Sequence, residues 1–195
     1  MNRIYVIIGK SASGKDTIAK RLLSDSSLRL EPIVPYTTRP IRAGEKNGTD
    51  YFFTDDLDLR ELRAQGKVIE CRTYHTVYGD WNYFTADDGQ IDLTKSDSLT
   101  VGTIESYVSF RNYFGEDRVT PIYIEVDDGE RLTRALEREK KQQVPKYEEM
   151  CRRFLADQQD FSEEKLRDAG IDRRFENKDI DETVAEIADV IRQRK

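Results

Sequence analysis

The segment from Gly9 to Thr17 constrains the fold of this chain more than any other part of the sequence. It reads Gly-Lys-Ser-Ala-Ser-Gly-Lys-Asp-Thr and lies between an apolar run, Ile4–Ile8, and an amphipathic run, Thr17–Leu23. Two glycines with this spacing, then a lysine, between a buried strand and a helix, are typical of a phosphate-binding loop. The backbone amides of such a loop surround phosphate oxygens, and the positive end of the helix dipole points at the same place. The segment therefore predicts a site for a nucleoside triphosphate.

Single residues of this loop have expected roles. Lys15 places a point charge beside the phosphoryl group that is transferred, so we count it as catalytic. Asp16 stands where a serine or threonine hydroxyl usually meets magnesium, and Thr17 carries a hydroxyl one residue later. Whether Asp16 reaches Mg²⁺ through a water, or other groups hold the metal, stays open. The residues expected to bind ATP are Gly9, Lys10, Ser11, Ala12, Ser13, Gly14, Lys15, Asp16 and Thr17.

Strand-like and helix-like runs alternate along the chain. The strand-like runs are Tyr5–Ile8, Ile33–Tyr36, Val68–Arg72, Leu99–Gly102 and Ile122–Val126. The helix-like runs are Lys15–Leu23, Asp56–Gln65, Ile104–Tyr113, Glu130–Lys141, Tyr147–Leu166 and Ile180–Arg194. This alternation predicts an α/β fold, a parallel sheet with helices on both faces. Ligands of such sheets bind beyond the carboxyl ends of the strands, where the Gly9 loop begins.

Two segments depart from the alternation. Residues 37–84 are rich in tyrosine, phenylalanine, threonine and glycine, and short alternating runs there predict a small antiparallel insert. Residues 138–148 are strongly basic, contain Pro145 and lie between two helix-like runs, so we expect a hinged lid. At 195 residues the chain suits one domain, 1–195, with its core formed by residues 1–36 and 85–195.

Composition excludes several classes of protein. Charged residues make up 36% of the chain, yet the apolar 37% gathers in short runs, which indicates a folded protein. A net charge of −6 argues against nonspecific nucleic-acid binding. No apolar run approaches the ~18 residues of a membrane span. Cys71 and Cys151 have no paired spacing, and the chain starts directly with a strand-like run, so we expect a cytoplasmic protein. A single histidine, His75, is too few for a zinc site.

A second motif runs from Thr37 to Tyr51. Arg39 and Arg42 stand three residues apart in a loop with proline and glycine, and two guanidinium groups can clamp a phosphate in bidentate fashion. The Tyr51 phenol could add a hydrogen bond to the same group. Read alone, the motif fits a solvated basic loop beside an aromatic edge strand equally well.

Together with the Gly9 loop, this motif resembles the guanylate kinase family, whose members transfer the terminal phosphate of ATP to GMP. The match is close from Thr37 to Tyr51, and the order of loop, insert, arginine-bearing lid and C-terminal helix also agrees. The resemblance implies that the phosphate of a monophosphate substrate is held by Arg39, Arg42 and Tyr51, with Glu45 in the same motif and Tyr78 as a second tyrosine. It also implies that Glu70 accepts hydrogen bonds from N1 and the amino group of guanine. ATP with Mg²⁺ would be the phosphate donor.

The resemblance further implies that lid arginines stabilise the transferring phosphoryl group. The candidates are Arg134, Arg138 and Arg153. Arg153 fits best, Arg134 and Arg138 are ambiguous because this lid is longer than in typical members, and each of the three could equally be a surface charge.

Three positions depart from the family and concern the base. Pro35 and Asp80 stand where hydroxyl residues usually contact guanine, and Glu105 is the only carboxylate close to the end of the central strand. We keep Asp80 and Glu105 as candidate substrate-binding residues, although a carboxylate at position 80 that faced guanine O6 would repel it.

These departures leave alternatives open. A kinase of the same fold could phosphorylate another nucleoside monophosphate or a sugar phosphate such as ribose bisphosphate. A non-catalytic binding module is a further option, although the phosphate loop argues against it. Expected partners are small-molecule nucleotides, with no nucleic acid and no membrane, and a homodimer is one option for the assembly.

Overall fold

Two sheets organise the computed structural model, which describes residues 1–42, 44–76 and 79–194. The larger sheet has the strand order β2-β7-β1-β8-β9, and every neighbouring pair is parallel. Its strands are β1 (Ile4–Ile8), β2 (Leu30–Pro32), β7 (Asp97–Gly102), β8 (Val119–Glu125) and β9 (Arg174–Glu176). The helices are α1 (Lys15–Ser24), α2 (Asp56–Ala64), α3 (Ile104–Phe114), α4 (Asp128–Lys140), α5 (Tyr147–Asp160), α6 (Glu163–Asp168) and α7 (Ile180–Gln193).

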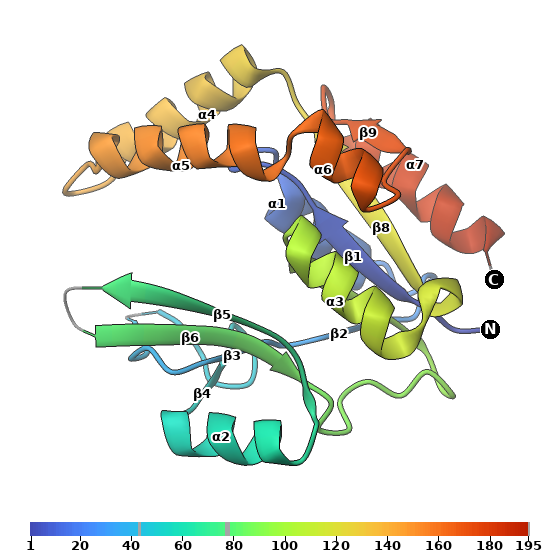
Figure 1. Cartoon of the computed structure of the whole chain (residues 1–195). Helices are drawn as coiled ribbons and strands as arrows, with labels where there is room; N and C mark the ends of the chain where they lie inside the picture. Colours follow the sequence, from blue (N-terminus) through green and yellow to red (C-terminus); the bar gives the residue numbers. More distant parts are fainter. Residues whose placement is uncertain (43, 77–78, 195) are drawn as a thin grey trace.

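Strand β1 lies at the centre of the larger sheet, and all five of its residues are buried. Its side chains alternate between two hydrophobic clusters because successive residues of a strand face opposite sides. Ile4, Val6 and Ile8 pack with residues of α3 and α6, whereas Tyr5 and Ile7 pack with residues of α1 and α7. Figure 1 shows these helices on the two faces of the sheet. The α/β fold expected from the alternation of runs is thus confirmed.

The smaller sheet contains β3 (Tyr36–Thr37), β4 (Phe52–Phe53), β5 (Val68–Thr76) and β6 (Gly79–Ala86) in the order β4-β3-β6-β5. The β3–β6 and β5–β6 pairs are antiparallel, and β3–β4 is parallel. Helix α2 covers one face and buries Leu59 against Phe84 and Ala86. In Figure 1 the smaller sheet extends to the same side of the core as the α4–α5 helix pair.

The structure corrects three details of the sequence reading. The run 33–36 is not one strand, because β2 ends at Pro32 in the larger sheet and β3 begins at Tyr36 in the smaller one. The expected helix 147–166 is two helices, since Ser162 has extended backbone angles and caps α6 through the Lys165 N–H. The short strand β9 had no clear sequence signal. The connection between α4 and α5 covers residues 141–146, inside the expected lid.

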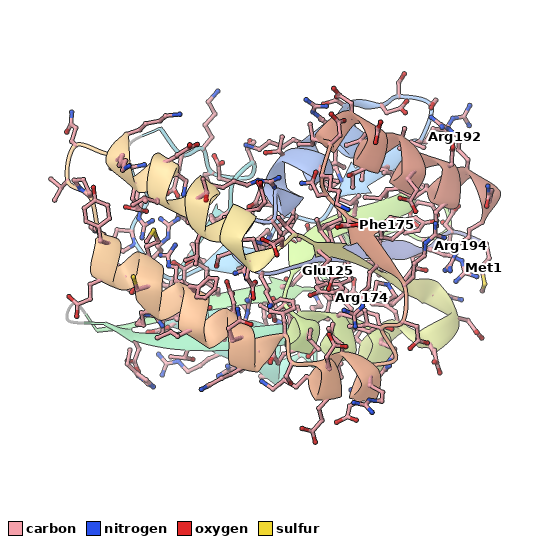
Figure 2. The ribbon with its side chains drawn as sticks, turned by 90° about the horizontal axis from the view of Figure 1, so that it is seen from above. Met1, Glu125, Arg174, Phe175, Arg192 and Arg194 are labelled. Atoms are coloured by element: carbon pink, nitrogen blue, oxygen red, sulfur yellow. The ribbon has the colours of Figure 1, made fainter. Side chains whose placement is uncertain are left out.

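Strand β9 forms the edge of the larger sheet beside β8. The Arg174 guanidinium donates to Glu125 Oε1 at 2.7 Å and to Glu163 Oε1 at 3.0 Å, so it joins the two strands to α6. Figure 2 shows Arg174 and Glu125 lying together near the end of β8.

Among the residues that the structure describes, a membrane-spanning helix is absent, because each helix is too short or too polar to span the bilayer.

Candidate functional site

The loop from Gly9 to Thr17 connects the carboxyl end of β1 to the first turn of α1. Gly14 is the N-cap of α1 at φ +87°, and no side chain of the described part of the sequence caps the helix. Uncapped N–H groups at a helix N-terminus need partners, and together with the helix dipole they favour an anion. The backbone of this loop therefore fits the phosphates of ATP.

Both glycines of the loop lie where a side chain would not fit. A Cβ atom on Gly9 would lie 2.7 Å from the carbonyl oxygen of Ile124, and one on Gly14 would lie 2.6 Å from Asn177 Nδ2. Asn177 donates from this nitrogen to the Ser13 carbonyl at 2.8 Å. Asn177, the residue that follows β9, thus holds the loop from one side.

The three polar residues at the end of the loop differ in exposure. The Lys15 side chain is 20% exposed, with Nζ 4.0 Å from the Asp16 carboxylate, whereas Asp16 and Thr17 are exposed on the first turn of α1. Ser13 Oγ is buried and has no hydrogen-bond partner within residues 1–42, 44–76 and 79–194. The placement of Lys15 suits contact with a phosphate chain, and Asp16 and Thr17 stay candidates for Mg²⁺.

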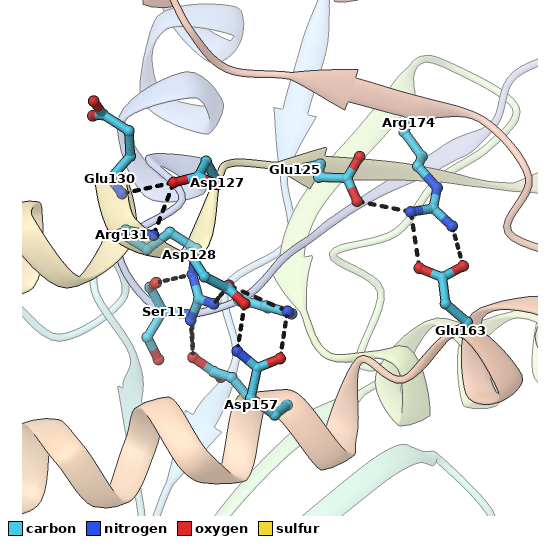
Figure 3. Close-up of polar contacts among 12 residues, drawn as sticks. Ser11, Glu125, Asp127, Asp128, Glu130, Arg131, Asp157, Glu163 and Arg174 are labelled. Carbon is cyan, nitrogen blue, oxygen red and sulfur yellow. Dashed lines mark hydrogen bonds and ion pairs between the residues drawn. The ribbon is translucent and has the colours of Figure 1, made fainter.

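A buried arginine of α4 holds the loop from the other side (Figure 3). Arg131 is 1% exposed, and its Nε donates to the Ser11 carbonyl at 3.0 Å. Its Nη2 donates at 2.7 Å to Asp157 of α5, and the same carboxylate oxygen accepts the Ser11 N–H at 2.8 Å. Both backbone polar groups of Ser11 are therefore bound by one ion pair that joins α4 and α5 to the loop.

The pair also explains a strained residue. Ala12 has φ +62°, a left-handed conformation that costs a non-glycine residue about 1–2 kcal/mol. The Ser11 N–H and the Lys10 C=O belong to one trans peptide, in which the two groups point in opposite directions. Because the N–H points to Asp157, the Lys10 carbonyl points away from it. There it accepts the Ser13 N–H at 3.2 Å. The bonds to Ser11 thus fix the peptide planes that lead into Ala12.

Lys10 extends this contact between the loop and helices α4 and α5. Its Nζ donates to Gln158 Oε1 at 2.9 Å and lies 3.4 Å from Asp128 Oδ1. Gln158 donates in turn to Asp128 at 2.6 Å. Burial tends to raise the pKa of Asp128, but the hydrogen bonds from Gln158 and Arg131 outweigh it and lower the pKa. Lys10 and Arg131 therefore balance the charges of Asp128 and Asp157 next to the loop.

Arg138 and Arg153, the expected lid arginines, line one cavity of about 70 Å³ between α4 and α5. Ser11 and Phe154 also line it, so the cavity reaches the phosphate loop. Arg153 Nε donates to Glu149 at 2.8 Å. The pKa of Glu149 is lowered to about 2, mainly by the hydrogen bond from Arg152 and further by that from Arg153. Arg134 is turned toward the loop side, where its Nη2 donates to the Asn177 carbonyl at 3.2 Å.

Arg39 is buried rather than free. It is 3% exposed and forms a bidentate pair with Glu45, with distances of 2.7 Å and 2.5 Å. Its Nε donates to Tyr83 Oη at 3.0 Å, and its guanidinium carbon lies 5.1 Å from the centre of the Tyr51 ring. The hydrogen bond from Arg39 holds the pKa of Glu45 at about 2. Arg42 is exposed; its backbone N–H donates to Glu45 Oε2 at 2.8 Å, and its carbonyl accepts the Glu45 N–H at 3.1 Å.

Glu70 is the centre of a second cluster. It is 8% exposed and accepts hydrogen bonds from Thr85 Oγ1 at 3.0 Å, from Arg72 Nε at 3.2 Å and from Ser106 Oγ at 3.4 Å. Thr85 and Arg72 belong to the smaller sheet, whereas Ser106 is in the first turn of α3. The cluster therefore joins the insert to the core at a buried carboxylate.

The remaining candidates lie outside these clusters. Asp80 Oδ1 is 2.7 Å from His75 Nδ1 across the β5–β6 ladder, and both side chains are exposed. Glu105 is exposed on α3, while the next residue, Ser106, points to Glu70. Tyr78 lies outside the described residues.

Several residues of these clusters escaped the sequence reading. Arg72 and Ser106 had usable signals, because Arg72 follows Glu70 by two residues on one predicted strand and Ser106 directly follows Glu105. Asn177, Arg131 and Asp157 had none, since they are polar residues of ordinary helix or loop segments far from the loop in sequence.

Comparisons with known proteins agree with this geometry. The family model described as guanylate kinase matches residues 1–87. A guanylate kinase of Nitrosomonas europaea is 38% identical over 80 residues, which cover 40% of this chain and 39% of that protein. One of Porphyromonas gingivalis is 30% identical over 126 residues, which cover 64% of this chain and 65% of that protein. The matched segments thus span less than two thirds of these relatives.

The likeness in structure covers nearly the whole chain. The crystal structure of guanylate kinase from Anaplasma phagocytophilum has a TM-score of 0.65 and 25% sequence identity, and the match covers 98% of this chain and 85% of that one. The sequence match includes the Gly9–Thr17 loop and the Thr37–Tyr51 motif, and the structural match covers nearly the whole chain. The chain is therefore similar to guanylate kinases in the sequence of residues 1–87 and in structure over nearly its whole length.

Proposed function

We propose that this chain is an ATP-dependent guanylate kinase that transfers the terminal phosphate of ATP to GMP and yields ADP and GDP. The observation that carries the proposal is the buried Glu70 carboxylate, held between the insert and α3 in the same chain as an uncapped phosphate loop. An ionised carboxylate only accepts hydrogen bonds, and guanine offers N1–H and its amino group on one edge.

The phosphate of GMP would bind near Arg39, Arg42 and Tyr51. Tyr51 is half-buried beside Arg39, and burial raises the pKa of its phenol, which therefore stays protonated as a hydrogen-bond donor. Arg42 is the exposed arginine of this motif, and its side chain makes no hydrogen bond to the residues that the structure describes. Arg39 would orient the motif through its pair with Glu45. If the phosphate of GMP displaces the Glu45 carboxylate, the Arg39 guanidinium would bind that phosphate instead.

Positioning and charge neutralisation are the main requirements of phosphoryl transfer. The loop amides and Lys15 would hold the donor phosphates, and Arg138 and Arg153 would close over the transferring group from the cavity between α4 and α5. Water would be excluded when the helices approach the insert. The attacking phosphate is already anionic, so no strong general base is required.

Magnesium fits this site through the exposed hydroxyl of Thr17 and the exposed carboxylate of Asp16 on the first turn of α1. Bound with ATP, it would neutralise charge on the phosphates. Lys15 and the lid arginines carry the rest of this neutralisation. Which of the two residues lies nearer the metal is testable with Asp16→Ala and Thr17→Ala variants titrated with Mg²⁺.

A coupled assay of ADP release tests the proposal. Wild-type protein is given ATP and Mg²⁺ with GMP, dGMP, AMP, CMP, UMP or sugar phosphates, and Lys15→Ala serves as the inactive control. We expect turnover with GMP far above the other acceptors. Turnover restricted to another acceptor would refute guanylate kinase and favour a different small-molecule kinase. A lack of turnover with every acceptor, with ATP bound, would favour a binding module.

A further inference from the structure

The base site poses a chemical problem for guanine. Guanine O6 is a hydrogen-bond acceptor and needs a donor. Pro35 has no side-chain donor, and Asp80 is bound to His75 on the β5–β6 hairpin. A site that reads guanine must therefore take the O6 donor from another residue.

Arg72 lies beside Glu70 in the required place. The two residues alternate on β5, so their side chains share one face of the smaller sheet. Arg72 pairs across the ladder with Tyr83, the tyrosine that binds Arg39. The positive charge of Arg72 also acts on Tyr51. Burial raises the pKa of the Tyr51 phenol, and Arg72 is one of the charges that lower it. Arg72 thus lies next to the Glu70 carboxylate and opposite Tyr83, the tyrosine whose hydroxyl accepts from Arg39.

The guanidinium of Arg72 has donors to spare. Its Nε–H is used on Glu70 Oε2 at 3.2 Å, and the structure shows no other hydrogen bond from this group to the residues it describes. The side chain is 33% exposed. The Nε–H and the neighbouring Nη N–H of arginine point the same way in a rigid fork. The Nη donor therefore points past the edge of the carboxylate.

Glu70 keeps acceptor sites for guanine next to this donor. Each oxygen of a carboxylate can accept two hydrogen bonds. Oε1 accepts one, from Thr85, and Oε2 accepts one from Arg72 and a long one from Ser106. Ser106 Oγ also lies 3.3 Å from Thr103 Oγ1, so its proton can turn to Thr103 and free a site on Oε2.

We infer that Arg72 donates a hydrogen bond to guanine O6 and is a specificity-determining residue of the acceptor site, an inference that rests on the proposed function. Carboxylate and guanidinium lie side by side, as N1–H and O6 do on the edge of guanine. Adenine presents an amino donor where guanine has O6, so Arg72 would face a donor and Glu70 would face the N1 acceptor. The pair therefore favours guanine over adenine.

The test combines a base analogue with a substitution. Dissociation constants and kcat/KM are measured for GMP, IMP and 6-thio-GMP with the wild type and Arg72→Met; 6-thio-GMP keeps N1–H and the amino group but has a sulfur, a weak hydrogen-bond acceptor, in place of O6. We expect the wild type to prefer GMP over 6-thio-GMP by about 10-fold, as for the weakening of one charged hydrogen bond. In Arg72→Met this preference should fall toward 1, while the preference for GMP over IMP, which reports the amino group near Glu70, persists.

Other results separate the inference from the proposed function. Equal losses for GMP and the analogue in Arg72→Met would refute the O6 contact and indicate a phosphate or structural role. Binding of GMP with the predicted Arg72 dependence, but no turnover, would overturn the kinase and keep the inference. Failure of the wild type to bind GMP would overturn both. Arg60→Ala, on the exposed face of α2, is the matched control and should leave all ratios unchanged.

Discussion

Removal of the Arg131 side chain tests whether helices α4 and α5 stabilise the Gly9–Thr17 loop through a desolvated ion pair. Arg131→Met keeps the apolar stem that packs near Phe154, where the guanidinium carbon lies 5.0 Å from the ring centre. It removes the donors to Ser11, Asp128 and Asp157 at 3.0, 2.5 and 2.7 Å. The protein then keeps a carboxylate next to the loop without its cation.

The magnitude follows from the exposure of the partners. Asp157 is 14% exposed and would keep only the Ser11 N–H, so it becomes a largely buried, unpaired charge. Breaking a buried pair in this way costs about 3–5 kcal/mol. Asp128 adds little, because it is 45% exposed and keeps Lys10 and Gln158. We therefore expect the free energy of unfolding to fall by about 3–5 kcal/mol.

Urea unfolding at pH 7, analysed by linear extrapolation, measures this loss. The double variant Arg131→Met/Asp157→Asn should recover about 2 kcal/mol, because the amide oxygen still accepts the Ser11 N–H and no buried charge remains. Arg152→Met is the matched control. It removes an exposed bidentate pair with Glu149 on the same helix pair and should cost less than about 1 kcal/mol.

Two results would refute the reasoning. A loss below about 1 kcal/mol in Arg131→Met would mean that water solvates the pair as it does at the surface. A double variant no more stable than the single one would mean that the loss comes from packing and the Ser11 carbonyl rather than from the charge of Asp157.

Three further predictions concern the loop and the insert. Lys15→Ala should lower kcat by at least about 100-fold without a change in unfolding, and wild-type turnover would remove this lysine from the site. Gly14→Ala forces a side chain into φ +87° and against Asn177, so thermal or urea unfolding should show a loss of about 1–2 kcal/mol. Glu45, whose pKa is lowered from 4.5 to about 2 by Arg39, contributes stability above pH 4.5 that is lost as the pH falls toward 2. The stability difference between wild type and Glu45→Gln should therefore shrink over that range, and a difference independent of pH would contradict the charged pair.

Much of the fold could be read from local patterns. The run Ile4–Ile8 followed by Gly9–Thr17 predicts a buried strand, a phosphate loop and a helix, since each depends on residues close in sequence. The split of the expected helix 147–166 was not predicted. Ser162 can cap a helix or lie within one, and the buried position of Phe161 decides between them.

The base site shows where the sequence reading could have gone further and did not. Glu70 was assigned by the family motif, and the alternation of a strand places Arg72 on the same face. What no pattern contains is the direction of Asp80, which the hairpin register sets opposite His75. A residue type limits what a side chain can bind, but its neighbours across the sheet decide what it does bind.

Local patterns in the sequence thus suffice for the class of fold, for the conformation of the Gly9–Thr17 loop and for a set of candidate phosphate-binding residues. Which charges pair with one another depends on the tertiary structure. Arg131 and Asp157 are separated by 26 positions, and both lie more than 100 positions from Ser11, yet they bind the same residue of the loop. Such contacts depend on how α4 and α5 pack on the end of β1, and packing between distant elements has no signal in a short stretch of sequence.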